Sequence, residues 1–89
     1  MSLAQIRYFV VVAEEGNVGR AARRLGVSQP PLRRQIQGLE EELGARLFER
    51  IPRGVRLLPE GAVFLAHARR ILGEVDAAVA AVRIGRPPT

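Results

Sequence analysis

Hydrophobic residues recur at helical spacing along most of the chain, beginning at its first residues. The spacing predicts a helix over about residues 3–15, with one apolar face formed by Leu3, Ile6, Phe9, Val10 and Ala13. A second apolar strip lies on the far side of the same helix and consists of Tyr8, Val11 and Val12. Because both sides are apolar, we expect other parts of the molecule to cover this helix twice.

Two shorter helices follow, and a tight turn joins them. Asn17 is the expected N-cap of the first one, whose apolar positions are Val18, Ala21, Ala22 and Leu25. Gly26 suits the left-handed residue that often ends a helix, and Ser28 is the expected N-cap of the next helix. That helix, residues 29–43, would bury one face formed by Leu32, Ile36, Leu39 and Leu43.

The remaining pattern predicts a hairpin and one long helix. Extended runs at 46–50 and 55–58 flank "IPRG" (51–54) and predict a two-stranded wing. A helix over 59–84 would begin with Pro59 and Glu60, which are both favoured in a first turn. Its apolar residues alternate by three and four positions, as in a coiled-coil seam between two copies: Leu65, Ala68, Leu72, Val75, Val79 and Val82. Residues 85–89 would be a tail or a truncated linker.

This order of elements predicts a mainly α fold. A winged helix-turn-helix domain of three helices plus a two-stranded wing would occupy residues 1–58, followed by a long dimerising linker helix at 59–84. In a helix-turn-helix the second helix of the pair, here 29–43, enters the major groove of DNA. The alternative is that this helix only packs in a helical bundle.

The positive charge lies in the middle of the chain. The net charge is +5, and every basic residue is an arginine. Nine of the fourteen arginines lie between Arg20 and Arg56, against four glutamates, whereas the flanking segments nearly cancel. This distribution indicates either a solvated basic surface or a polyanionic partner.

Composition argues against several other classes of protein. The chain has no cysteine, so disulfides and thiolate zinc sites are excluded. No apolar run approaches the roughly 20 residues of a membrane span, and the N-terminus does not resemble a signal peptide, so we expect a cytoplasmic protein. A single histidine, His67, and two serines cannot assemble a nucleophile with its base. We therefore expect no enzymatic activity, no cofactor and no metal site.

The stretch "SQPPLRRQ" (28–35) carries the side chains best suited to reading DNA. Gln29, Arg33, Arg34 and Gln37 gather near the start of the third helix, on the side away from its apolar face. Arginine pairs with guanine and glutamine with adenine in the major groove. Helix-turn-helix proteins use this end of the helix to approach bases.

The two prolines of this stretch fit the same hypothesis. Pro30 and Pro31 have no N–H for an N-cap to satisfy, which would leave the Ser28 hydroxyl free for DNA. Their rings could also press against thymine methyl groups. The alternative is that the prolines only start the helix.

Further arginines and one asparagine are candidates for the DNA backbone. Asn17 and Arg20, at the start of the second helix, are placed to hold a phosphate. Arg50 and Arg53 flank the wing turn and could reach a phosphate or a narrow minor groove. For these two residues, simple exposure to solvent is the competing interpretation.

The order of these parts resembles the N-terminal DNA-binding domain of LysR-type bacterial transcriptional regulators. The resemblance rests on "AARRL", "SQPPLRRQI" and "RLFER", continues through the "RGVRL" wing and "FLAHARRIL", and covers residues 3 to about 82. It implies a winged helix-turn-helix whose linker helices pair in a homodimer, and hence an inverted-repeat operator in double-stranded DNA. Family members usually carry a second domain that binds an inducer. This chain has none, so we expect DNA binding without a response to an inducer.

The resemblance also implies roles for individual positions. The base-facing residues would be Gln29, Pro30, Pro31, Arg33 and Arg34. The backbone or groove contacts, from the resemblance and the residues together, would be Asn17, Arg20, Ser28, Gln37, Arg50 and Arg53. Two positions depart from the family pattern. Leu58 replaces a capping threonine or serine, and Arg33 often corresponds to a small hydroxyl residue.

Two other functions compete with sequence-specific DNA binding. The chain could be a protein-interaction or dimerisation module whose arginines only keep it soluble, and the salt dependence of binding separates these alternatives. RNA binding is disfavoured because Phe9, Phe48 and Phe64 occupy core-like positions, which leaves no stacking platform beyond Tyr8.

Overall fold

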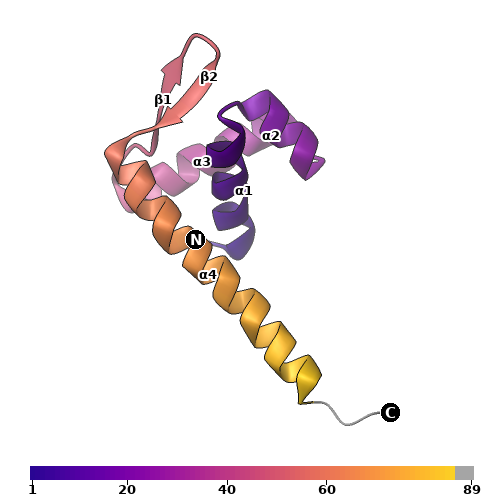
Figure 1. The fold of residues 1–89 in the computed structure, drawn as a ribbon. Coiled ribbons are helices and arrows are strands. Elements are labelled where there is room, and N and C mark those ends of the chain that lie inside the picture. The colour runs from indigo at the N-terminus through magenta and orange to yellow at the C-terminus, as the bar shows by residue number, and fades with distance from the viewer. Residues whose placement is uncertain (86–89) are drawn as a thin grey trace.

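A computed structural model describes residues 1–85 and contains four helices and one hairpin within that range (Figure 1). The elements are α1 (Leu3–Glu15), α2 (Val18–Leu25), α3 (Gln29–Leu43), β1 (Phe48–Ile51), β2 (Gly54–Leu57) and α4 (Pro59–Ile84). The predicted fold class is confirmed, and the four helices begin and end where the hydrophobic pattern places them. Of the expected tail, residues 86–89 lie outside the described part of the chain.

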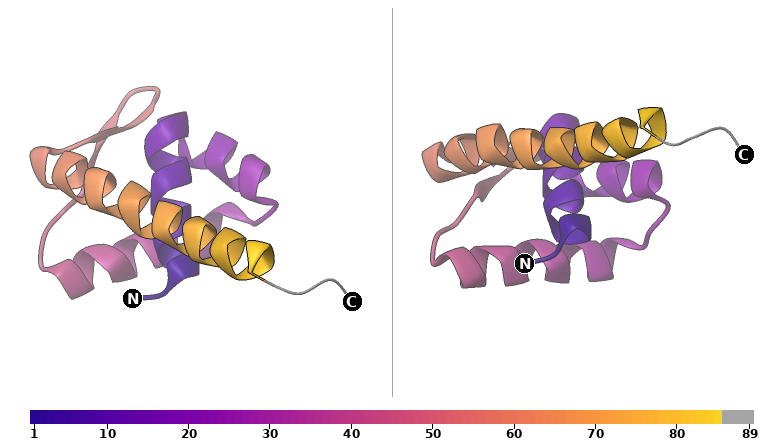
Figure 2. Two further views of the ribbon diagram at one scale, coloured as in Figure 1. Left: turned by 60° about the horizontal axis from the view of Figure 1, so that its bottom comes forward. Right: turned by 90° about the horizontal axis from the view of Figure 1, so that it is seen from below.

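The helix α1 is the centre of the molecule. Figure 2 shows α4 crossing one side of α1 while α3 runs along the other side. Most of both apolar strips of α1 is accordingly buried, including Val11 and Val12 on the second strip, whereas Leu3 at the start of the first strip is exposed. The expectation that α1 is covered twice is confirmed.

An aromatic cluster joins the three layers of the core. Phe9 is fully buried, and its ring centroid lies 5.3 Å from that of Phe48 at the start of the wing. On the other side it lies 5.1 Å from Phe64 of α4, in an edge-to-face arrangement. Leu32 and Leu39 of α3 complete the buried core. The wing and α4 therefore pack on the same residue of α1.

The first wing strand begins later than the sequence predicts, and the second begins earlier. They are Phe48–Ile51 and Gly54–Leu57, rather than 46–50 and 55–58, with a two-residue turn between the paired Ile51 and Gly54. The reason lies before β1. The Leu47 N–H donates to Oε2 of Glu40 at 2.7 Å, and the Leu47 carbonyl accepts from the Leu58 N–H at 2.9 Å. The Leu47 N–H is thus bonded to α3 instead of to the hairpin, while the Leu47 carbonyl bond to Leu58 continues the register of the ladder.

The predicted coiled-coil seam of α4 requires a correction. Ala68 has 0% of its surface exposed within the single chain, and Leu65 and Leu72 pack against the same core. Ala68 therefore cannot contact a second copy. Farther along the same helix face, Val79 is 44% exposed and Val82 is 66% exposed. One continuous apolar face is used internally in its first half and lies open in its second half, which projects from the body in Figure 1.

Ion pairs on the surface connect three helices. Glu14 of α1 lies 2.8 Å from Nη1 of Arg24 on α2 and accepts a 3.4 Å hydrogen bond from Arg69 of α4. The hydrogen bond from Arg24, and then that from Arg69, outweigh the effect of burial and hold the pKa of Glu14 below its usual value. Exposed pairs of this kind contribute little stability individually.

Within residues 1–85, no helix is long and apolar enough to cross a bilayer.

Two glycines of α4 provide a test of this packing. A Cβ at Gly61 would lie 2.1 Å from the Leu47 carbonyl oxygen, whereas a Cβ at Gly73 would meet nothing within 4 Å. We expect Gly61→Ala to destabilise the fold by about 1–3 kcal/mol, because the Leu47 backbone must move. Gly73→Ala should stabilise it by about 1 kcal/mol through helix propensity. Urea unfolding at one fixed protein concentration measures both changes, and similar shifts for the two variants would contradict the close approach at Gly61.

Candidate nucleic-acid interface

Figure 2 shows α3 on the side of the molecule away from α4. Polar side chains are exposed along the N-terminal part of this helix. Its exposed residues include five of those predicted from the sequence: Gln29, Pro30, Pro31, Arg34 and Gln37. Leu32 and Ile36 turn inward and anchor the helix in the core. The Arg34 side chain makes no hydrogen bond or ion pair within residues 1–85, so it is available to a partner.

The start of α3 has the unusual cap that the two prolines predict. Ser28 has the extended backbone of an N-cap residue, but its side chain makes no capping hydrogen bond. The N–H groups that a serine would normally satisfy belong to the second and third helical positions. Here these positions are Pro30 and Pro31, which have no N–H. Ser28 is exposed, and its hydroxyl is therefore left free beside the exposed side chains at the start of α3.

Asn17 is the N-cap that the sequence predicts, and it also makes a contact that its sequence position alone does not indicate. Its Oδ1 accepts from the Arg20 N–H at 2.9 Å and so caps α2, while its Nδ2 donates to the Arg53 carbonyl at 3.4 Å. Both ends of the amide are thus engaged within the protein. Asn17 therefore braces α2 against the wing turn, and its contact with a phosphate stays a prediction.

The wing is held to the α1–α2 turn at two further points. The Val55 N–H donates to the Gly16 carbonyl at 3.0 Å. Gly54 has a φ of +149°, and a Cβ there would lie 2.1 Å from the same Gly16 oxygen, so only glycine fits. The hairpin therefore has a fixed position relative to the helix-turn-helix, and Arg53 lies exposed at its turn. Sequence patterns do not reveal this tether, because it joins residues far apart in the chain.

Arg20 folds back onto the end of α1. Its Nη2 donates to the Glu15 carbonyl at 3.1 Å, and its Nε lies 4.0 Å from the Glu15 carboxylate. This placement differs from the predicted approach to a phosphate, because the guanidinium caps the C-terminus of α1, the negative end of the helix.

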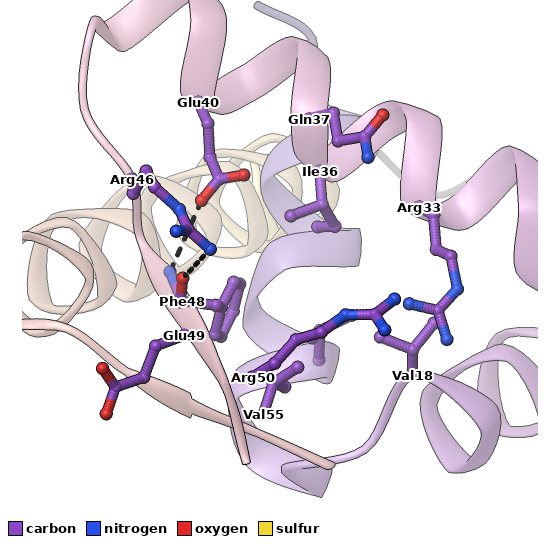
Figure 3. A pocket seen from close by; sticks show the side chains of 11 residues that line it. Val18, Arg33, Ile36, Gln37, Glu40, Arg46, Phe48, Glu49, Arg50 and Val55 are labelled. Atoms are coloured by element: carbon purple, nitrogen blue, oxygen red, sulfur yellow. Dashed lines mark hydrogen bonds between the residues drawn. The ribbon is translucent and has the colours of Figure 1, made fainter.

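Arg33 and Arg50 converge on one hollow between α3 and the wing. Figure 3 shows their guanidinium groups pointing toward one another, Arg33 from α3 and Arg50 from β1. Two nearby glutamates already have other partners. Glu40 accepts from the N–H groups of Leu47 and Phe48, and Glu49 accepts from Arg56. Within residues 1–85, neither Arg33 nor Arg50 forms an ion pair, although Glu40 and Glu49 line the same hollow.

The candidate site thus contains the exposed N-terminal part of α3, a wing in a fixed position and a hollow lined by arginines between them. It contains no grouping of three or more metal-ligating side chains in the part of the chain that the structure describes. Exposed arginine and glutamine side chains on a helix of this kind suit hydrogen bonding to base edges and phosphates.

Known proteins with similar sequences are transcriptional regulators. The chain is 64% identical over 72 residues to the HTH-type transcriptional regulator TfdS of Cupriavidus pinatubonensis. This match covers 81% of this chain and 24% of the relative. The chain is 61% identical over 72 residues to ClcR of Pseudomonas putida, with the same coverage. The chain therefore spans about a quarter of the length of these relatives.

Solved structures match the fold over nearly the whole chain. The DNA-binding domain of BenM, solved in complex with catB site 1 DNA, has a TM-score of 0.92 and 47% identity, and the match covers 100% of both chains. The DNA-binding domain of CbnR in its DNA complex has a TM-score of 0.90 and 48% identity, over 94% of this chain and 97% of that one.

Residues 3–62 match the family described as bacterial regulatory helix-turn-helix protein, lysR family. This range contains α1, α2, α3, the wing and the start of α4. With the relatives and the solved structures in agreement, the chain belongs to the LysR family of bacterial regulatory helix-turn-helix proteins.

Proposed function

We propose that this chain is the sequence-specific DNA-binding domain of a LysR-type transcription regulator and that it binds double-stranded DNA as a dimer. The observation that carries the proposal is the match, over the whole chain, to a BenM domain solved on DNA. In this arrangement α3 (29–43) enters the major groove, and the wing (46–58) lies at the backbone or the minor groove.

Base reading is assigned to the exposed start of α3. Arg34 is the strongest candidate, because it is exposed, has no partner within residues 1–85 and projects beside Pro30 and Pro31. A bidentate contact from arginine to guanine is the commonest specific contact in the major groove. Gln29 would contribute a polar contact, and the two proline rings would contribute an apolar one. The free Ser28 hydroxyl would form a further hydrogen bond. Gln37 and Arg53 would contact the backbone or a groove edge.

Dimerisation is assigned to the open half of the α4 apolar face. Leu72 and Val75 are partly buried, and Val79 and Val82 are exposed on the same face. Packing of this stripe against a second copy would bury the apolar surface that a single chain leaves open. A two-fold dimer places two α3 helices on one side of DNA and implies an inverted-repeat operator.

The alternative function is a basic protein-interaction module without sequence-specific DNA binding. The relatives of this chain are transcriptional regulators. This supports, for either function, a non-enzymatic role and a location in the bacterial cytoplasm with the chromosome. A DNA-binding domain that neutralises several phosphates loses affinity steeply as salt increases. An interaction module would show no such salt-dependent binding to duplex DNA.

Selection of bound sequences from random duplex DNA tests the proposed function directly. We expect enrichment of an inverted repeat with two equivalent half-sites. Binding that is sensitive to salt but enriches no motif would contradict sequence-specific recognition by this chain.

Arg34→Ala should relax the preference at one base pair of each half-site. The expected loss is about 1–3 kcal/mol on the selected duplex and much less on a duplex already changed at that base pair. Fluorescence anisotropy on both duplexes measures the difference. Equal losses on the two would place Arg34 among the phosphate contacts instead.

Val79→Glu should weaken the dimer, because it introduces a charge into the open half of the α4 face. Ala77→Glu is the matched control, since residue 77 is also exposed but lies nearly opposite residue 79 around the helix. Analytical ultracentrifugation should show a lower mass for the first variant only. An unchanged mass for Val79→Glu would mean that this face does not form the dimer.

A further inference from the structure

A second hollow, which shares Arg33 and Arg50 with the one between α3 and the wing, is bounded by the N-terminus of α2. Its volume is about 390 Å³, and its polar rim consists of Asn17, Gln29, Arg33 and Arg50, with Val18 and Gly19 at the start of α2. Side chains from three separate elements thus meet around one space. No carboxylate contributes to this lining.

The charges around this hollow favour an anion. Arg33 and Arg50 point toward one another without an ion-pair partner in residues 1–85 (Figure 3). Two guanidinium groups that face each other repel, and an anion between them converts the repulsion into two attractions. Guanidinium groups bind phosphate with paired, charge-assisted hydrogen bonds.

The backbone of α2 adds donors on the same side. The N–H groups of Val18 and Gly19 belong to the first helical turn, where no intrahelical acceptor exists, and neither finds another acceptor within residues 1–85. The N-terminus of a helix also carries a partial positive charge. Gln29 is close by, since its Nε2 lies 3.3 Å from the position that a Cβ on Gly19 would occupy. Glycine at 19 therefore keeps this corner open.

The position of Arg33 on α3 separates it from the base-reading residues. Arg33 shares a helix side with Ile36, Gln37 and Glu40, which line the space toward the wing. Arg34 is rotated by about 100° around the helix and is exposed, whereas Arg33 is half-buried. The wing residue that Arg33 faces, Arg50, is held in place by the tether between the hairpin and the α1–α2 turn.

We propose that Arg33, Arg50 and the N-terminus of α2 form one cradle that holds a single backbone phosphate of the bound DNA. The inference rests on the proposed function and moves Arg33 from the base contacts to the backbone contacts. One phosphate then binds α2, α3 and the wing together, which sets the depth of α3 in the groove.

Neutral phosphates test this cradle. Duplexes carrying one methylphosphonate at a time, based on the selected operator, are titrated with the 89-residue chain and with Arg33→Ala, Arg50→Ala and the double variant. On unmodified DNA, each single variant should weaken binding about tenfold or more on all sequences alike and reduce the salt slope by about 1. The double variant should lose less than the product of the two single losses, because both side chains act on one phosphate.

At one methylphosphonate position in each half-site, both single variants should bind as well as the parent chain. Arg70→Ala controls for the loss of one charge, because residue 70 is exposed on α4, on the side opposite its apolar face. This variant should keep its affinity and its methylphosphonate profile.

Three results would overturn the cradle while leaving DNA binding intact. Arg33→Ala could change the preference at one base pair, which would make Arg33 a base reader. Different methylphosphonates could silence the two variants, which would indicate two separate contacts. Fully multiplicative losses would also separate them. Failure of the parent chain to bind any duplex would instead overturn the proposed function itself.

Discussion

The burial of Phe9 between the wing and α4 is the constraint on which the rest of the structure depends. Its ring contacts Phe48 on one side and Phe64 on the other, so one residue of α1 positions two elements at once. With α4 across one side of α1 and α3 along the other, the proposed DNA-binding and dimerisation surfaces are separated by a packed layer. A small domain thereby presents two independent interfaces without a second core.

The wing is positioned by polar contacts as much as by the core. Hydrogen bonds from the Val55 N–H to the Gly16 carbonyl, and from the Asn17 side-chain amide to the Arg53 carbonyl, hold the hairpin against the turn that starts α2. The same turn presents the free N–H groups of α2. The wing and the first helix of the motif therefore move as one body, and Arg50 has a defined place opposite α3. Such preorganisation reduces the ordering cost of binding DNA.

Much of this architecture could be predicted from the sequence because it depends on local patterns. Helix boundaries follow from apolar spacing together with capping residues such as Asn17 and Gly26, and the structure confirms them. The strand boundaries were wrong, because Leu47 bonds to Glu40 and Leu58, which are distant in sequence. The bond from the Asn17 side chain to the Arg53 carbonyl was missed because these residues are far apart in the sequence. Local patterns indicate which groups can bond, but only the fold determines which of them meet.

The α4 helix illustrates the limit most clearly. Its 3-4 apolar repeat predicts that something covers the face, yet the repeat is identical whether the cover is the chain's own α1 or a second copy. The structure assigns Ala68 to the first kind of packing and leaves Val79 and Val82 open. The boundary falls near Leu72, where α4 leaves the body of the molecule. The first half of this stripe thus packs within the chain, and its open second half is the surface proposed to contact a second copy.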